Sequence, residues 1–146
     1  MAYQTMTTRE AAQRGERMGR GARSINPSYQ AFSLLYAGFI GLPVIAGVDK
    51  FFHLLVDWTV YASPVFAAAF GGNVVLMMRI VGVVEIAAGI LVALRPRLGG
   101  LVVAGWLAAI VVNLLLIPGF LDVALRDIGL MVGALALSRL AAQFEG

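Results

Sequence analysis

The chain has 146 residues, of which 60% are hydrophobic and 13% charged, and its mean hydropathy is +0.88. This balance excludes an ordinary soluble globular domain and leaves room for four spans of about 20 apolar residues, a tail and short loops. The chain has no cysteine, which excludes disulfides and thiolate-held metal clusters within it. We therefore predict an all-α membrane protein without a soluble catalytic domain, which favours a protein that is not an enzyme on its own.

Residues 1–27 form a basic tail with five arginines and two glutamates. Because the tail lacks a strong apolar stripe, we expect it to be disordered or loosely helical by itself. The positive-inside rule places it in the cytoplasm, against anionic lipid headgroups. Alternatively, it orders against a partner subunit through Tyr3, Met6 and Met18. Spaced arginines without an aromatic platform do not predict nucleic-acid binding.

The membrane domain occupies residues 28–146 and holds four apolar stretches of spanning length. The predicted spans are about 29–48, 73–94, 98–117 and 123–140. The basic tail, the Arg95–Arg97 loop and Arg139 all fall on the cytoplasmic side if both termini are cytoplasmic. The fold predicted is a four-transmembrane-helix bundle in the bacterial inner membrane, with an interfacial helix on its outer face.

The interfacial helix is predicted over about 50–62. Asp49, His53 and Asp57 recur at four-residue spacing there, while aromatic residues fall on the other positions, as in an amphipathic helix. The residues expected at the membrane interface are Phe51, Phe52, Trp58 and Tyr61. One histidine and two carboxylates at one-turn spacing also fit a loosely held metal, but a solvated polar face gives this pattern more often, so we predict no metal site.

The stretch 73–94 is central because it carries Arg79 and Glu85 inside an apolar run. An ionisable residue within a span is costly and usually faces the bundle interior. Glu85 shares one helix face with Gly82 and Gly89, so this face is expected to pack against a neighbouring helix. Arg79 lies on a different side of the helix, so each charge is expected to find its partner on another element.

The predicted topology gathers polar residues toward the outer leaflet as an intramembrane network. Its members are Lys50, Arg79, Glu85, Asn113, Arg126 and Asp127. Two interpretations remain open: interhelical salt bridges that fix the packing of the bundle, or a polar pocket for a quinone headgroup, a lipid headgroup or a proton.

The order of these features resembles the DoxX-like family of four-helix membrane proteins. The resemblance rests on Val48–Phe51 at the end of the first span, on Arg79–Gly89 in the second and on Leu125–Leu130 opening the fourth. It implies a multi-pass inner-membrane protein in a group tied to quinone-linked oxidoreductases, including a thiosulfate:quinone oxidoreductase subunit. By position, Lys50, Arg79, Glu85, Arg126 and Asp127 match the family's polar residues.

Three functions remain as hypotheses. The first is a non-catalytic accessory subunit of a larger redox or energy-converting membrane complex, which contacts other subunits through glycine-rich helix faces and its tail. The second is the quinone-reactive subunit of an oxidoreductase, with Glu85 or Asp127 handling protons. The third is a small-solute or lipid carrier, although the sequence lacks the paired repeats typical of carriers. We expect no covalently bound cofactor, and the candidate ligands are a quinone or a bound lipid.

Overall fold

The computed structural model describes residues 7–144, and every regular element in that range is a helix. The helices are α1 (Thr8–Ile25), α2 (Pro27–Phe52), the 3-10 helix η1 (Trp58–Tyr61), α3 (Pro64–Ala68), α4 (Val74–Leu94), α5 (Pro96–Leu115) and α6 (Leu121–Phe144). The all-α prediction is confirmed for the described part of the chain. Tyr3 and Met6, the possible anchors to a partner, lie outside the described residues.

Local sequence explains where the long helices begin. The Asn26 side chain accepts a hydrogen bond from the Ser28 amide, and Pro27 occupies the first turn of α2, which are favoured residues at these positions. Asn73 caps α4 in the same way, by accepting from the Leu76 amide. Arg95 alone separates α4 from α5, because Pro96 starts a new helix directly after it.

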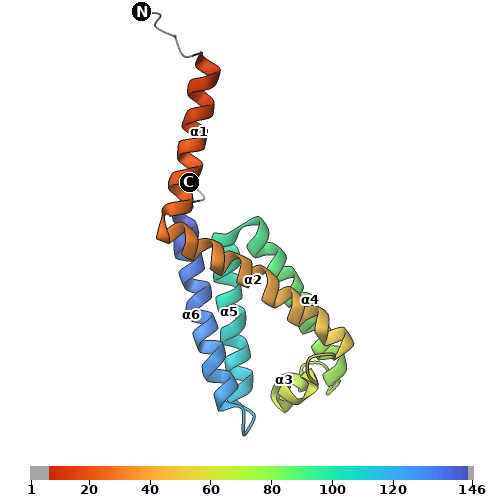
Figure 1. The fold of residues 1–146 in the computed structure, drawn as a ribbon. Coiled ribbons are helices and arrows are strands. Elements are labelled where there is room, and N and C mark those ends of the chain that lie inside the picture. The colour runs from red at the N-terminus through yellow and green to blue at the C-terminus, as the bar shows by residue number, and fades with distance from the viewer. Residues whose placement is uncertain (1–6, 145–146) are drawn as a thin grey trace, which may run out of the picture.

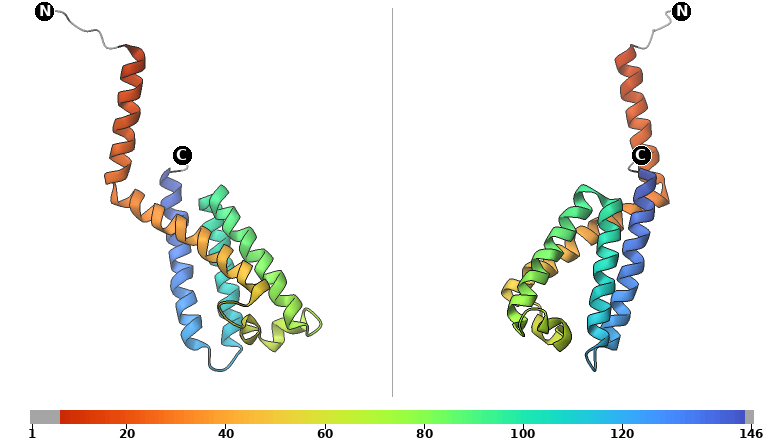
Figure 2. Two further views of the ribbon diagram at one scale, coloured as in Figure 1. Left: turned by 45° about the vertical axis from the view of Figure 1, so that its right-hand side comes forward. Right: turned by 180° about the vertical axis from the view of Figure 1, so that it is seen from behind.

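The four long helices of the bundle form two antiparallel pairs (Figure 1). α2 packs along α4, α5 packs along α6, and α4 also contacts α5. The pairs lie together near the Arg95 turn and diverge toward the other end, where η1 and α3 lie (Figures 1 and 2). The core where the two pairs meet contains Phe39, Ala88, Val92, Val103 and Leu137.

Three helices, α2, α4 and α5, are long and apolar enough to cross a membrane. Large apolar side chains on them are exposed, as on Leu34, Leu42 and Ile45 of α2 (76%, 57% and 58%). A helix that is apolar all round needs an apolar surrounding, so these exposed faces suit lipid or other membrane helices. Three of the four predicted spans thus correspond to helices of spanning character, and α2 extends past the predicted 29–48 at both ends.

The prediction of one interfacial helix over 50–62 is wrong. α2 ends at Phe52 because His53 adopts a left-handed conformation (φ 55°) and its amide bonds the Asp49 carbonyl oxygen at 2.6 Å. Residues 53–57 are not helical, and only Trp58–Tyr61 form a short 3-10 turn. The four-residue spacing of Asp49, His53 and Asp57 therefore does not place them on one helix face.

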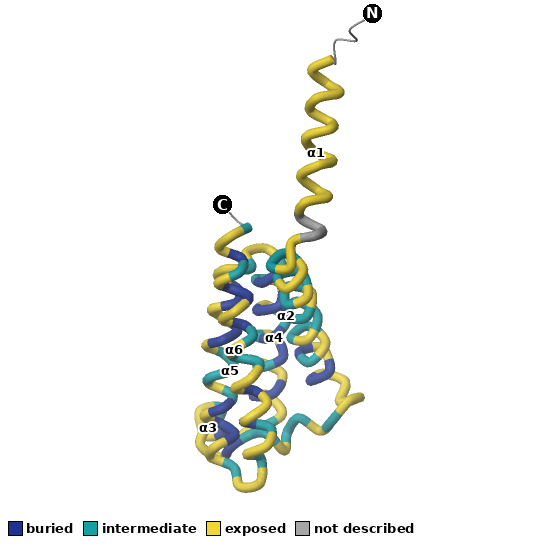
Figure 3. The backbone as a smooth tube through the Cα atoms, turned by 60° about the vertical axis from the view of Figure 1, so that its left-hand side comes forward, coloured by how far each residue is buried: buried dark blue, intermediate teal, exposed yellow. Residues whose placement is uncertain are grey.

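The described part of the tail contains one helix, α1. α1 begins with a capping box in which Glu10 accepts from the Thr7 amide (3.0 Å) and Thr7 Oγ1 accepts from the Glu10 amide (3.4 Å). The side chains of residues 7–22 are all exposed, and α1 extends away from the bundle at the end where α6 finishes (Figures 1 and 3). The capping box thus stabilises the start of α1 locally, where the side chains of residues 7–22 do not pack on the bundle.

Candidate functional site

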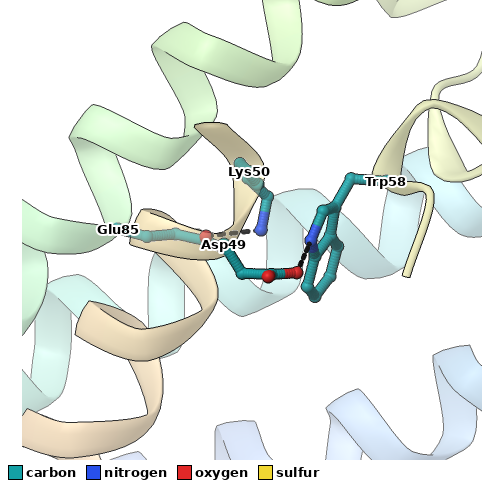
Figure 4. Close-up of polar contacts among 4 residues, drawn as sticks. All are labelled: Asp49, Lys50, Trp58 and Glu85. Atoms are coloured by element: carbon teal, nitrogen blue, oxygen red, sulfur yellow. Dashed lines mark hydrogen bonds and ion pairs between the residues drawn. The ribbon is translucent and has the colours of Figure 1, made fainter. Parts of the chain in front are cut away.

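The centre of the candidate site is a buried ion pair between α2 and α4. Lys50 Nζ lies 2.5 Å from Glu85 Oε2, and both residues are buried, with exposures of 3% and 8%. The same ammonium lies 3.7 Å from the centre of the Trp58 ring, as a cation–π contact requires. Figure 4 shows the lysine held between the carboxylate and the indole. The predicted partner of Glu85 on another helix is therefore Lys50.

Asp49, next to Lys50 on α2, is a structural acceptor. Its carboxylate accepts from Trp58 Nε1 at 2.7 Å and from the amides of Leu54 and Leu55 at 2.9 and 3.1 Å. These bonds fold the chain back after α2 and hold the Trp58 ring against Lys50 (Figure 4). Asp49 thereby positions one wall of the ion-pair site.

Glycines allow α2 and α4 to come close enough for this pair to form. A Cβ on Gly82 would lie 2.7 Å from the Gly47 carbonyl oxygen, and one on Gly47 would lie 2.6 Å from the Gly82 carbonyl oxygen. Farther along, a Cβ on Gly89 would meet the Ile40 carbonyl oxygen at 2.9 Å. The glycine-lined face of α4 that the sequence predicted does pack on a neighbour, and it buries Glu85 against α2.

Asn113 of α5 fastens the connection between α2 and α4. Its Oδ1 accepts from the Ser63 amide at 3.0 Å, and its Nδ2 donates to the Tyr61 carbonyl oxygen at 2.6 Å. Asn113 and Ser63 are both buried. The sequence placed Asn113 in the intramembrane network, and its hydrogen-bond partners are backbone groups of the loop on either side of Ala62.

The acidic residue of α6 that the sequence placed in the network, Asp127, is buried at 7% exposure. Its carboxylate lies 3.5 Å from Arg126, whose side chain is 68% exposed. Asp127 is therefore a buried carboxylate on a third helix of the bundle, and its ion pair is with Arg126 of the same helix.

Arg79 does not join this cluster. Its side chain is exposed on α4, and within residues 7–144 no ion pair or hydrogen bond engages it. Since Val75 and Val83 on the same side of α4 are exposed as well, Arg79 faces outward from the bundle. The structure thus unites Lys50 and Glu85 and leaves Arg79 apart from them.

Trp106 of α5 was not singled out from the sequence, yet it borders the site. Its side chain lies beside Glu85, while its buried Nε1 has no hydrogen-bond partner of suitable geometry among the described residues. Trp106 also lines an open, apolar groove of about 360 Å³ between α4 and α5, with Ala88 and Gly105. Its position in mid-span was a usable signal, because membrane tryptophans usually lie at the interface.

The expected interfacial aromatics have different environments. Phe51 and Phe52 are exposed at 41% and 66%, whereas Trp58 and Tyr61 are half-buried and pack with their rings 6.1 Å apart. In the described part of the chain no three His, Asp or Glu side chains gather as metal ligands. Trp58 thus contacts the polar cluster through Lys50 and Asp49, and its place at a membrane interface stays a prediction.

The connection after α2 contains one further ordered carboxylate, Asp57. It accepts from the Thr59 hydroxyl at 2.6 Å and from the Thr59 amide at 3.0 Å. These two hydrogen bonds lower the pKa of Asp57 below its ordinary value of 3.8. Asp57 therefore caps η1 as an anion.

The polar groups of this cluster bind one another. Lys50 contacts Glu85 of α4 and the Trp58 ring of η1, and Asp49 accepts from Trp58 and from two amides of the connection after α2. Such an arrangement suits a lock between helices, because removing either partner of a buried pair leaves an uncompensated charge.

Comparison with protein-family models, with curated proteins and with solved structures yields no match.

Proposed function

We propose that this chain is a non-catalytic accessory subunit of a larger bacterial inner-membrane complex, of redox or energy-converting type. The observation that carries the proposal is the closed ion pair of Lys50 and Glu85 beneath Trp58. Because its charges are engaged with each other inside the bundle, this cluster serves packing, and the free surfaces of the molecule are left for binding. Those surfaces include the apolar faces of α2, α4 and α5 and the whole of α1.

In this proposal α6 is the fourth span and both termini are cytoplasmic. α6 runs antiparallel to α5 and beside it in all views (Figures 1 and 2). Three of its four charged residues, Asp122, Arg126 and Asp127, fall within its first two turns. The arginines of α1, the Arg95 turn and Arg139 lie toward the same end of the bundle, as the positive-inside rule asks of a cytoplasmic face. The resemblance of this chain's motif order to that of the DoxX-like family supports the same architecture.

A second candidate is the quinone-reactive subunit of an oxidoreductase, with its electron-carrying cofactor on a partner. One observation favours it: Trp106, whose side chain lies beside Glu85 and whose Nε1 has no hydrogen-bond partner of suitable geometry among the described residues, also lines an apolar groove open to the surface of the bundle. An indole donor and a carboxylate are groups that a quinone headgroup uses for hydrogen bonding and proton transfer. In this candidate the groove takes the apolar tail.

The experiment that tests the proposal is purification of the tagged native protein in mild detergent or nanodiscs, followed by mass spectrometry of bound proteins and extractable cofactors. A stoichiometric, cofactor-bearing partner is the expected result. Recovery of the chain alone with only phospholipid would overturn it.

The two candidates separate with a Trp106→Phe variant, which removes the indole donor but keeps an aromatic ring in the groove. Under the accessory proposal, this variant retains the partner and the electron-transfer rate of the complex. Loss of retained quinone with the partner still bound would favour the quinone-reactive candidate instead.

A further inference from the structure

Arg79 is a charged residue on an otherwise apolar outer face of α4. Val75 and Leu76, one turn before it, and Val83, one turn after it, are exposed at 49%, 46% and 57%. α4 is long and apolar enough to cross a membrane, so these side chains and the arginine face its surroundings together. An ionisable residue on a spanning helix is costly and marks a candidate binding site.

This arginine needs an anionic partner that the described part of the chain does not supply. No ion pair or hydrogen bond engages its guanidinium within residues 7–144. The other charged residue of α4, Glu85, lies six residues later and on a different side of the helix, where it is paired with Lys50. The acceptor for Arg79 therefore comes from another molecule.

The direction of α4 determines where this guanidinium reaches. α4 begins at Val74, directly after the connection between α2 and α4 (residues 53–73), and Arg79 follows five residues later, about 7.5 Å along the axis. Helical side chains tilt toward the N-terminus of their helix, so the favoured rotamers of Arg79 point toward the connection. Because an arginine side chain is about 6 Å long and snorkels to a membrane surface, its guanidinium comes to the level at which α4 begins.

Lipid phosphate is the anion that this position favours. Phosphates form a layer at the level where spanning helices begin, and a guanidinium binds them through paired hydrogen bonds. A carboxylate from another protein would have to be buried against the first three turns of α4, which contain no polar side chain other than Arg79. Burying such a pair without further hydrogen bonds costs as much as it gains, whereas a phosphate keeps its contact with water.

We propose that Arg79 holds the phosphate of a phospholipid in the leaflet on the side of the connection, and that the acyl chains of this lipid lie along the exposed face of α4. The proposal goes beyond the accessory function, because it requires only that α4 spans the membrane and involves no partner subunit. It assigns a lipid site to a charge that the Lys50–Glu85 cluster leaves unused.

Arg126 of α6 is a matched control. It also lies five residues after the start of its helix, and its side chain is 68% exposed. Unlike Arg79, it has a carboxylate beside it, since Asp127 Oδ1 lies 3.5 Å from its Nε. We therefore expect Arg126 to contact lipid phosphate less closely than Arg79 does.

The test is solid-state NMR on the purified full chain with ¹⁵N in its arginine side chains, reconstituted in phospholipid bilayers. Lipid ³¹P reduces the signal of a guanidinium nitrogen that lies near a phosphate. The difference between the native spectrum and that of Arg79→Gln isolates Arg79, and Arg126→Gln isolates the control. The Arg79 signal is expected to be reduced severalfold more than the Arg126 signal, as for nitrogens about 4 Å from phosphorus.

Two results would overturn the proposal. A signal from Arg79 that ³¹P does not reduce would mean that no phosphate is bound there. Equal reduction of both signals would mean that any arginine at this level meets the headgroups, without a site at Arg79.

A second variant, Arg79→Lys, tests for a protein carboxylate in native membranes. It keeps the positive charge and adds an amine that an apolar carbodiimide can couple to a neighbouring carboxylate. We expect no coupled product beyond that of the native chain. A covalent link to another protein in this variant alone would make that carboxylate the acceptor and overturn the lipid site. Recovery of partner subunits is measured separately, so the accessory function and the lipid site can fail independently.

Discussion

The two helix pairs of the bundle are held together in different ways. α5 and α6 follow each other directly in the chain and pack through apolar side chains and a glycine contact, Gly100 against the Ala134 carbonyl oxygen. α2 and α4 are separated by the long connection 53–73, and they share touching backbones and the buried Lys50–Glu85 pair. A short turn already restricts how α5 and α6 align, whereas α2 and α4 need a specific contact to fix their register.

The largest effect is expected from Glu85→Gln, which tests whether the ion pair is that contact. The variant leaves Lys50 buried without its counter-charge, so the free energy of unfolding in bicelles is expected to fall by about 3–5 kcal/mol. The same chemical change at the exposed Glu16 is the matched control and should alter it by less than about 0.5 kcal/mol. Replacing both charges, Lys50→Met with Glu85→Leu, should recover most of the loss.

A different outcome would give the Lys50–Glu85 pair a functional role in place of a structural one. If Glu85→Gln unfolds and assembles like the native chain but abolishes electron transfer to quinone in the intact complex, the ion pair is not a structural lock. The quinone-reactive function would then be favoured.

The glycine crossing is expected to give the next largest effect. In Gly82→Ala the new methyl group meets the Gly47 carbonyl oxygen, and overpacking of this kind costs about 1–3 kcal/mol. Gly105→Ala on α5 is the control, since a Cβ there has nothing within 4 Å, and it should be neutral or slightly stabilising. Unfolding of both variants in the same detergent compares the two positions; equal stability would mean that α2 and α4 do not cross where the glycines meet.

Asn113→Leu tests how the connection between α2 and α4 is held, because it removes the polar contact between α5 and this connection. The Ser63 amide and the Tyr61 carbonyl oxygen both lose their partner, which is expected to cost about 1–3 kcal/mol. Hydrogen exchange should accelerate at the Ser63 amide and remain unchanged in the Lys50–Glu85 region. Equal acceleration in both places would mean that the connection and the ion pair form one unit.

The smallest expected effect is a pH dependence confined to the connection between α2 and α4. Because the two Thr59 hydrogen bonds lower the pKa of Asp57 below 3.8, the anionic cap is stabilising above that pH and is lost as the pH falls through the lowered pKa. The protection of the Thr59 amide, taken as its exchange rate relative to the intrinsic rate at the same pH, should therefore stay high at neutral pH and fall only below about pH 3.8. In Asp57→Asn it should lose this pH dependence; a native-like profile in that variant would assign the titration to another group.

Hydropathy and small-residue spacing were enough to predict the apolar helices and the packing face of α4. The course of the chain after Lys50 was not predictable in this way, because a left-handed residue at His53 and the backbone amides bound by Asp49 are tertiary features that leave no periodic pattern. Helical spacing at Asp49, His53 and Asp57 therefore predicted a helix that the structure interrupts.

The same distinction applies to the candidate site, where the sequence predicted some features and not others. That Glu85 needs a partner on another helix followed from the cost of a buried charge, but its identity as Lys50 depends on how far α2 continues and how it crosses α4. Arg79 satisfied the same sequence criterion as Glu85 and yet faces outward, because the rotation of a helix that is apolar on all sides cannot be read from its composition.

The single residue between α1 and α2 also has a consequence for how this protein changes over evolutionary time. Since Asn26 caps α2 through the Ser28 amide and Pro27 needs no amide partner, the first membrane helix begins in the same way whatever precedes it. An N-terminal extension can therefore be gained, exchanged or clipped by a protease without unfolding α2 or the helices packed on it. A chain that lacks α1 is then expected to keep the same start of α2.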